Sequence, residues 1–258
     1  MNLLRDRVVL VSGGTQGVGA GIVRAAAGEG ATVAFTGRRP DAGDKLTAEL
    51  ASAGAAAAFI QTDLAEPQQA INSVRQTVDR FGRIDCLVNS AGLTTRGSLV
   101  DTSVELFDQH MAINLRAPFF TMQTAVADMV RRREPGTIVN IISMAQHGGQ
   151  PYLSPYAAAK AGLAGLTRNT AFAHRWDKIR INGVNIGWTQ TEGEDATQRQ
   201  FHGADDSWLD TANSKLPMGK MGQVDEIADF VVFLLSDRSG VVTGSVIDWD
   251  QYVPGAHD

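Results

Sequence analysis

The chain has 258 residues, of which 43% are hydrophobic and 20% are charged, and its formal net charge is −5. This composition excludes a disordered or fibrous chain, and the acidic balance argues against a partner that is a nucleic acid or a membrane surface. The single cysteine, Cys86, cannot form a disulfide within the chain. No apolar run approaches the roughly 18 residues of a membrane-spanning helix, and the charged N-terminus does not resemble a signal peptide. We therefore expect a soluble cytoplasmic protein.

Short apolar runs alternate with longer segments of helical pattern. The runs, which we expect to be strands, are residues 8–14, 32–37, 57–63, 84–92, 136–143, 179–187 and, more weakly, 244–250. Their nearly continuous apolar character is typical of strands buried on both faces. Helical patterns lie between them, for example at 17–30 and at 67–82, where Pro67 suits a first turn and Gly82 an end. This alternation predicts an α/β fold with a doubly wound sheet of about seven parallel strands flanked by helices.

The first expected strand leads directly into a glycine-rich turn, residues 11–22 (VSGGTQGVGAGI). Gly13, Gly17 and Gly19 fall between the strand and the next helix, where glycine adopts unusual backbone angles at little cost. Such a turn presents backbone N–H groups and a helix N-terminus to a ligand, which suits a pyrophosphate. The spacing G-x-x-x-G-x-G differs from the usual G-x-G-x-x-G pattern, and an ordinary tight turn is the alternative interpretation.

The end of the second expected strand bears on the choice of dinucleotide. A chain that binds NAD usually has an Asp or Glu there for the ribose hydroxyls. Here Gly37 occupies that place, and Arg38 and Arg39 follow. The missing carboxylate removes repulsion of a 2′-phosphate, which a guanidinium can bind through two hydrogen bonds. We expect NADP(H) in preference to NAD(H), which is also possible; the alternative is that both arginines are solvated loop charges.

Two other strand ends carry polar residues. Asp63 follows the third expected strand and either accepts a hydrogen bond from an adenine amino group or caps the turn before Pro67. Asn89 begins a run of small residues, 89–92 (NSAG), at the carboxyl edge where open α/β sheets bind ligands. Asn89 is equally compatible with a structural role that joins neighbouring strands.

The segment 154–166 (SPYAAAKAGLAGL) places Tyr156 four positions before Lys160. On a helix the two side chains share a face, and an ammonium within about 4–6 Å lowers the pKa of a phenol, which is otherwise near 10. Tyr156 would then serve as a general acid or base. Ser143, at the end of the fifth expected strand, is placed to orient a substrate oxygen or share its negative charge. Alone, the Tyr–Lys spacing is weak, because exposed pairs of this kind are common.

Together these motifs resemble the short-chain dehydrogenase/reductase family over nearly the whole chain. The matching residues are 13–19 (GGTQGVG), 61–64 (QTDL), 89–92, Asn114 within 111–120 (MAINLRAPFF), Ser143, 156–160 (YAAAK) and 217–237. The resemblance implies a single Rossmann-type domain over 1–258 and hydride transfer between a nicotinamide and an alcohol or carbonyl carbon. It also implies that Tyr156 exchanges the proton, that Lys160 binds the ribose and lowers the pKa of Tyr156, that Ser143 positions the substrate, and that Asn114 holds a proton-relay water.

The resemblance further implies a set of cofactor-binding positions, and we assign no metal site. The expected cofactor-binding residues are Gly13, Thr15, Gln16, Gly17, Val18, Gly19, Arg38, Arg39, Asp63, Leu64, Asn89, Ala91, Gly92, Tyr156, Lys160, Gly187, Thr189 and Thr191. The chain departs from the family pattern where Ile186-Gly187 replaces Pro-Gly and where Trp249 replaces the first glycine of Asp-Gly-Gly.

The stretch 188–222 lacks strand character and resembles the family's substrate lid. Its acidic residues disfavour anionic substrates, or simply form a solvated surface. The expected pocket walls are Thr94, Thr95, Met144, His147, Gln150, Tyr152, Trp188 and Trp208. This mixture suits a small neutral substrate such as a polyol, sugar or ketone. His147 is either a second polar contact or, as is more common for such a loop histidine, points to water.

Three alternatives stay open at this point. One is a 3-oxoacyl thioester reductase, with the basic run 131–133 facing an acidic carrier protein. A second is a non-catalytic regulator that binds the cofactor, and a third is an epimerase or dehydratase. The resemblance also implies a homotetramer joined through helices that contain 105–131 and 155–175.

Overall fold

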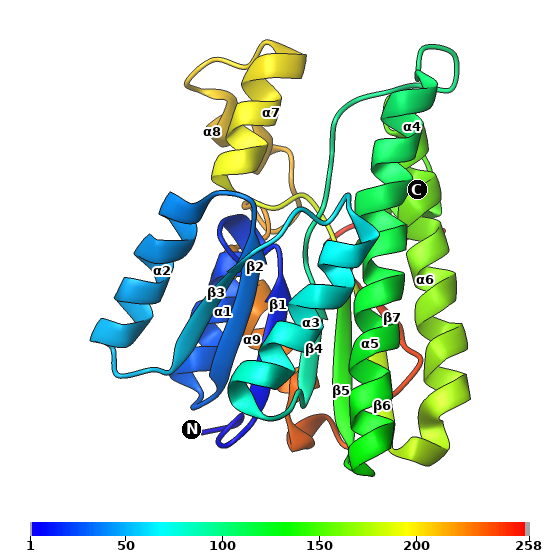
Figure 1. Cartoon of the computed structure of the whole chain (residues 1–258). Coiled ribbons are helices and arrows are strands. Elements are labelled where there is room, and N and C mark those ends of the chain that lie inside the picture. Colours follow the sequence, from blue (N-terminus) through cyan, green and yellow to red (C-terminus); the bar gives the residue numbers. More distant parts are fainter. Residues whose placement is uncertain (1, 256–258) are drawn as a thin grey trace.

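Residues 2–255, which the computed structural model describes, contain a seven-stranded parallel sheet with helices on both faces (Figure 1). The strands are β1 (Val8–Ser12), β2 (Thr32–Gly37), β3 (Ala57–Gln61), β4 (Cys86–Asn89), β5 (Gly136–Ser143), β6 (Ile179–Ile186) and β7 (Val246–Trp249). The helices are α1 (Gly17–Gly28), α2 (Pro40–Ser52), α3 (Pro67–Phe81), α4 (Val104–Met111), α5 (Ala117–Arg132), α6 (Ser154–His174), α7 (Glu192–His202), α8 (Trp208–Ser214) and α9 (Val224–Leu235). All seven predicted strands are confirmed, and the predicted doubly wound fold with them.

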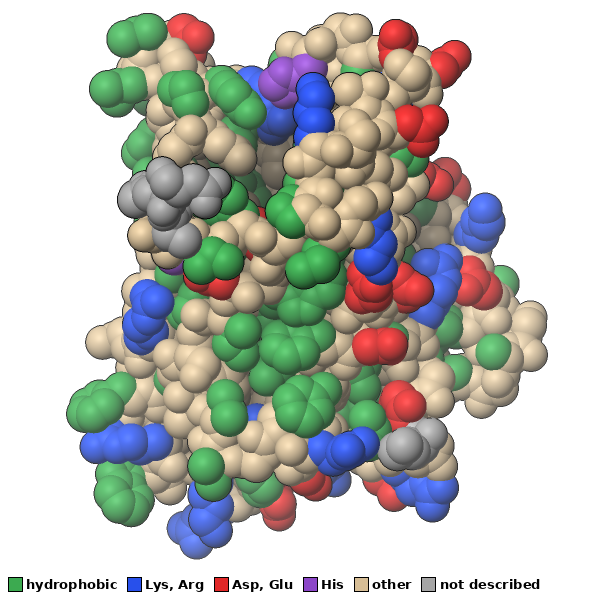
Figure 2. Space-filling model, turned by 180° about the vertical axis from the view of Figure 1, so that it is seen from behind, with side chains coloured by type: hydrophobic (Ala, Val, Ile, Leu, Met, Phe, Trp, Pro, Cys, Tyr) green, Lys and Arg blue, Asp and Glu red, His purple; other side chains and the backbone are tan. Residues whose placement is uncertain are grey.

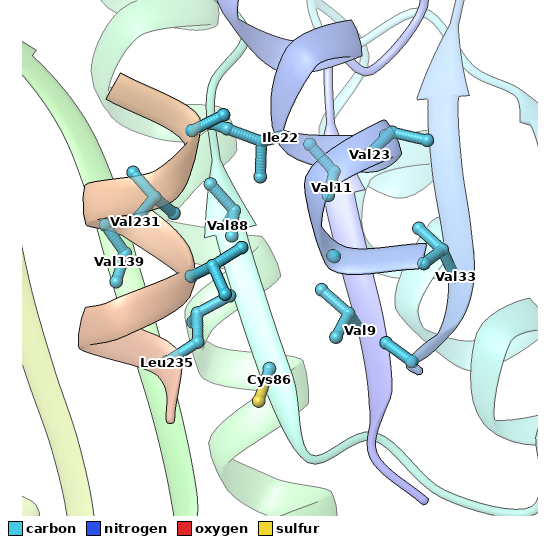
Figure 3. Packing of buried hydrophobic residues seen from close by; sticks show 14 of the residues in the cluster. Val9, Val11, Ile22, Val23, Val33, Cys86, Val88, Val139, Val231 and Leu235 are labelled. Carbon is cyan, nitrogen blue, oxygen red and sulfur yellow. The ribbon is translucent and has the colours of Figure 1, made fainter. Parts of the chain in front are cut away.

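Two hydrophobic cores explain why the strands are apolar without alternation. Val9, Val11 and Val33 point into a core covered by α1, α2 and α9, and Figure 3 shows such side chains from β1, β2, β4 and β5 meeting α1 and α9. Leu10 and Ala34, their neighbours in sequence, point to the opposite core, which α3, α5 and α6 cover. Since successive side chains of a strand alternate between faces, each strand requires apolar residues at nearly every position.

The strand order β3-β2-β1-β4-β5-β6-β7 reverses direction between β1 and β4. Ligands bind in such sheets at the carboxyl ends of the two strands on either side of the reversal. These ends are adjacent here, because Ser12 of β1 is paired with Asn89 of β4. The glycine turn after β1 and the small-residue run after β4 therefore lie side by side.

The helix expected to contain 105–131 is interrupted. A π-helical stretch, Ala112–Arg116, separates α4 from α5, and Asn114 lies within it. Single π turns inside α-helices are rare and occur often at functional sites. The interruption was not predicted, because its sequence has the ordinary apolar periodicity of a helix.

The segment 188–222 carries α7 and α8, which stand above the carboxyl ends of the strands (Figure 1). Its ends are held together by a bridge between Thr189 and Gly222. A Cβ at Gly222 would lie 2.9 Å from the ring of Trp249. Trp249, unexplained from sequence, thus packs against the base of this segment. Among the described residues, no helix is long and apolar enough to cross a membrane.

Candidate active site

The turn after β1 uses glycine where other residues would not fit. Gly13 and Gly17 have φ angles of +71° and +52°, a region that favours glycine. A Cβ at Gly13 would lie 2.6 Å from the Cα of Ala91, and one at Gly19 would lie 2.1 Å from the carbonyl oxygen of Gly13. The backbone of the turn therefore packs directly against the residues that follow β4 and against the first turn of α1.

The N-terminus of α1 at the end of this turn has free capacity for an anion. Gln16, the residue that precedes the helix, makes no capping hydrogen bond through its side chain, and the first turn contains no acidic residue. The first N–H groups of a helix need partners and carry partial positive charge. Thr191 lies beside this end, since a Cβ at Gly17 would be 3.6 Å from its methyl group. These features fit the pyrophosphate of a dinucleotide.

The end of β2 explains why no carboxylate occurs there. A Cβ at Gly37 would lie 2.4 Å from the methyl group of Thr15, so an Asp or Glu at position 37 would displace the glycine turn. Arg38 and Arg39 are exposed, and within the described residues neither forms an ion pair. The Arg39 guanidinium donates a 2.9 Å hydrogen bond to the side chain of Gln16, which brings it beside the same turn.

Asp63 and Asn89 both form hydrogen bonds within the protein, as the structural alternative for each residue requires. The Asp63 carboxylate accepts a hydrogen bond from the N–H of Ala65 at 3.0 Å, so it caps the turn before α3. The Asn89 amide donates to Asn140 at 2.8 Å and accepts from Thr121 at 2.7 Å. Asn89 therefore joins β4 to β5 and α5 through its side chain.

Leu64, Ala91 and Gly92 line the edge of the same region. Leu64 is buried in a small apolar cluster to which Ala91 also belongs. Gly92 is exposed, and a Cβ there would lie 3.5 Å from Asn114 Oδ1 and 4.0 Å from Lys160 Nζ. The run after β4 thus leads from the glycine turn to the predicted catalytic residues.

Tyr156, Lys160 and Ser143 come together at the start of α6. Tyr156 is 9% exposed and Lys160 is 3% exposed, and the Lys160 ammonium lies 5.6 Å from the centre of the Tyr156 ring. The ammonium donates a 2.8 Å hydrogen bond to the carbonyl oxygen of Ile141 in β5. The Ser143 hydroxyl accepts from the N–H of Ala145 at 3.1 Å. A phenol, an ammonium and a hydroxyl therefore share one buried corner.

Burial and neighbouring groups act on the pKa of Tyr156 in opposite directions. Burial raises the pKa of Tyr156 above its ordinary value, and an interaction with the Ser143 side chain and the positive charge of Arg96 lower that pKa in turn. The Lys160 ammonium donates its hydrogen bond to the Ile141 carbonyl, and the expected lowering of the pKa of Tyr156 by Lys160 stays a prediction.

Burial also lowers the pKa of Lys160, from 10.5 to about 8. Between these two values the unfolded chain binds more protons than the folded one, so stability rises with pH from about 8 to 10.5. Below pH 8 the fold bears the whole cost of burying the charge, about 3 kcal/mol. We expect Lys160→Met to raise the free energy of unfolding by about 1–3 kcal/mol at pH 7.

Urea unfolding without cofactor from pH 7 to 10.5 checks this expectation, and the difference between the variant and the natural chain should shrink across that range. Lys45→Met, at an exposed position of α2, is the matched control and should show no such trend. A Lys160→Met protein that is less stable at pH 7 would contradict it.

Asn114 is fully buried and forms hydrogen bonds with the loop that follows β4. Its Oδ1 accepts from the N–H of Leu93 at 2.9 Å, and its Nδ2 donates to the carbonyl of Leu93 at 3.0 Å and to the ring of His110 at 3.2 Å. Both amide hydrogens are thus used within the protein. The resemblance implied a relay water on Asn114, and its side chain retains only one acceptor position for that purpose.

Val18, Gly187 and Thr189 complete the expected cofactor set. Val18 packs against the core beneath the glycine turn. A Cβ at Gly187 would lie 2.1 Å from the Asp250 carboxylate, which explains a glycine there without the preceding proline. The Thr189 hydroxyl donates to the carbonyl of Gly187 at 3.0 Å, and the Thr191 hydroxyl accepts from the N–H of Glu194. Both threonine side chains therefore also shape the start of segment 188–222.

Several of the expected pocket-wall residues have hydrogen-bond partners within the protein. His147 lies 3.0 Å from the carboxylate of Asp248, and its side chain is 37% exposed, so it has a protein partner as well as contact with water. Trp188 donates to Glu194, and Trp208 to Asp195, each at 2.7 Å. Two of the acidic residues of this segment, Glu194 and Asp195, therefore accept hydrogen bonds from the indole N–H groups.

Sequence reasoning missed two residues beside Tyr156. Arg96 lies 3.1 Å from His202 and 5.3 Å from the centre of the Tyr152 ring, and so connects the loop after β4 to α7. His110 packs edge-on against Tyr156, with ring centres 6.2 Å apart. Arg96 lies in a loop whose path the sequence does not give, and a single histidine on a helix carries no signal of its partners, so neither residue could have been placed from the sequence.

Two lobes, one with α7 and α8 and the other with α4, rise above the sheet with a gap between them (Figure 2). A separate groove of about 1040 Å³ lies between α1, α9 and segment 190–209. It contains Thr191 but none of Asn114, Ser143, Tyr156 and Lys160, and its walls carry charges of both signs. The candidate active site is therefore the corner at the carboxyl edge of the sheet and not this groove.

Comparisons with known proteins identify similar chains. A family model described as enoyl-(acyl carrier protein) reductase matches residues 13–251. An uncharacterized oxidoreductase of Thermotoga maritima is 37% identical over 246 residues, which cover 95% of this chain and 96% of its own. L-Rhamnose 1-dehydrogenase (NAD(P)(+)) of Sphingomonas sp. is 32% identical over 257 residues, or 98% and 99% of the two chains.

A solved structure extends the similarity to three dimensions. The short-chain dehydrogenase/reductase from Serratia marcescens has a TM-score of 0.86 at 31% identity and covers 96% of this chain and 98% of its own. Because the sheet order, the glycine turn and the Tyr–Lys pair occur together in a chain matched over nearly its whole length, the protein belongs to the short-chain dehydrogenase/reductase family of oxidoreductases.

Proposed function

We propose that the protein transfers a hydride reversibly between NADP(H) and an alcohol or carbonyl carbon of a small neutral substrate. The observation that carries the proposal is the meeting of Ser143, Tyr156 and Lys160 in one corner, next to an uncapped helix N-terminus. The cofactor would supply the hydride acceptor or donor. The glycine turn and the start of α1 would hold its pyrophosphate, and Lys160 its ribose.

In this proposal the protein's own residues manage the proton and the substrate oxygen. The hydroxyl of Ser143 donates a hydrogen bond to the substrate oxygen and orients it toward Tyr156. The Tyr156 phenol gives its proton to that oxygen during reduction and takes it back during oxidation. An ordinary phenol is already protonated at neutral pH, and burial raises the pKa of Tyr156 further, so Tyr156 carries the proton that reduction requires. The Ser143 interaction and the Arg96 charge limit that rise.

The preference for NADP(H) rests on the end of β2. Thr15 leaves no room for a carboxylate at Gly37, and Arg38 and Arg39 have no acidic partner among residues 2–255. The relative from Sphingomonas is named as using NAD(P)(+), so both cofactors occur among similar proteins. A guanidinium that binds a phosphate makes a charge-assisted hydrogen bond worth about 1.5–3 kcal/mol.

Replacing both arginines tests that preference. We expect Arg38→Ala/Arg39→Ala to raise the Kd for NADPH by about 10–100-fold, because the 2′-phosphate loses its cationic partners, and to change the Kd for NADH by less than about 3-fold. Cofactor fluorescence titration measures both constants. Arg75→Ala, at an exposed position of α3, is the control. Equal affinity of the natural chain for NADPH and NADH would overturn the preference.

We further propose that residues 1–258 form one cofactor-binding and catalytic domain, with 188–222 as its lid. A panel of polyols, sugars, ketones and oxoacyl thioesters, followed by nicotinamide absorbance with each cofactor, would identify the substrate class. Reaction only with oxoacyl thioesters would favour the alternative of a 3-oxoacyl thioester reductase, which the acyl-carrier description of the matching family model supports. Cofactor binding without any turnover would favour a regulator.

A homotetramer is the proposed assembly. An apolar groove of about 610 Å³ lies between α5 and α6 and is lined by Phe119, Val126, Val130 and Leu166, among others. Phe119 and Val130 are 44% and 41% exposed. Such a surface is suited to the equivalent helices of a second copy. Sedimentation that finds only monomer would refute this assembly.

A further inference from the structure

His110 is a buried polar side chain outside the expected catalytic set. It lies on α4, one turn before Asn114, and is completely buried. Its Nδ1 is 3.2 Å from the Asn114 amide nitrogen, and its Nε2 is 3.0 Å from the carbonyl oxygen of Thr95. An apolar residue could fill this volume without the cost of burying two ring nitrogens, so the two contacts need a reason.

The partners determine the form of the ring. Asn114 contacts both the N–H and the carbonyl of Leu93, which assigns its Oδ1 and Nδ2 without ambiguity. Its Nδ2 can only donate, so His110 Nδ1 must accept; the Thr95 carbonyl can only accept, so Nε2 must carry the hydrogen. His110 is therefore the neutral Nε2–H tautomer. Burial lowers its pKa from 6.5, although the bond to Thr95 opposes this, and that agrees with a neutral ring.

Through these bonds α4 and the π turn hold the loop after β4 at three backbone groups. Asn114 binds two of them at Leu93, and His110 binds the third at Thr95. The same imidazole lies edge-on to the Tyr156 ring, at an angle of 74°. One residue thus contacts the expected substrate wall, the Asn114 amide and the phenol that is expected to exchange the proton.

We propose that His110 is a positioning residue, which fixes the loop 93–95 and Asn114 relative to Tyr156. The inference rests on the proposed function, because it concerns the geometry of that site. It requires a side chain that accepts at one end and donates at the other. Glutamine offers the same polarity through its amide, whereas leucine offers only a similar volume.

The test compares the kcat of His110→Leu with that of His110→Gln, each measured with saturating cofactor. We expect His110→Leu to lower kcat about 10-fold or more, since small displacements at a reacting centre have effects of this size, with the Kd for cofactor within about 2-fold. We expect His110→Gln to recover kcat to within about 3-fold of the natural chain. Gln76→Leu, at an exposed position of α3, is the control for a change from a polar residue to leucine and should leave kcat unchanged.

Two kinetic outcomes would overturn the proposal. One is an unchanged kcat in His110→Leu, and the other is an equal loss in both variants, which would mean that only the shape of the ring matters. If Tyr156→Phe keeps full turnover in the same assay, the proposed function fails instead, and the two failures are distinguishable.

A spectroscopic measurement on the natural chain covers the case in which a variant does not fold or no substrate is found. The chain has five histidines, and ¹⁵N NMR of the imidazoles separates the two neutral tautomers from the charged ring. We expect the His110 signal to report Nε2–H between pH 8 and 6.5. The Nδ1–H tautomer or a charged ring in that range would overturn the proposed bonding.

Discussion

Tyr156→Phe is expected to lower kcat/KM about 10³-fold, within the range that general acid–base catalysis contributes. The substitution removes only the phenolic oxygen, so the ring that packs against His110 and Ala145 stays in place. The substrate oxygen would then have to exchange its proton with water in a corner that is largely closed to solvent.

The measurement is nicotinamide absorbance under turnover, together with a cofactor titration. The Kd for cofactor should change by less than about 3-fold, because the proposed ribose contact is made by Lys160. Tyr252→Phe, at a 67% exposed position near the C-terminus, is the control and should be fully active. Turnover of Tyr156→Phe equal to that of the natural chain would remove the basis of the proposed mechanism.

Gly19→Ala is expected to have the second largest effect, on cofactor binding. The new Cβ would lie 2.1 Å from the carbonyl oxygen and 2.9 Å from the carbonyl carbon of Gly13. These are backbone atoms, so no side-chain rotation can relieve the contact and the glycine turn must move. Overpacking of this kind costs about 1–3 kcal/mol of stability, and displacement of the proposed pyrophosphate site should raise the Kd for NADPH about 30-fold or more, roughly 2 kcal/mol.

Gly28→Ala is the matched control, because it makes the same change in the same helix. A Cβ at Gly28 would have nothing within 4 Å, and alanine is the better helix former. Its Kd should equal that of the natural chain, with equal or slightly greater stability. Unaltered NADPH binding by Gly19→Ala, in a protein as stable as Gly28→Ala, would show that the turn does not hold the cofactor.

The helix boundaries show how far local signals reach. Pro67 and Gly82 correctly marked the start and end of α3, and Gly82 has the left-handed φ of +80° that ends helices. The pattern around Asn114 carried no comparable mark, and the π turn there went unpredicted. It is stabilised from outside the helix, by the bonds of Asn114 to Leu93, a residue 21 positions earlier.

The amino-acid sequence by itself determined the number and order of the strands, the glycine turn and the identity of the residues that meet in the candidate active site. These follow from local apolar pattern and from side-chain chemistry at strand ends, which depend on residues close in the chain. Only the tertiary structure decided which polar atoms remain available: the Asn89 amide is used by Asn140 and Thr121, and Lys160 is directed at Ile141. The hydrogen-bond partners and the burial of a side chain depend on segments far apart in sequence. These contacts determine the pKa values and positions of the polar groups that the sequence had identified.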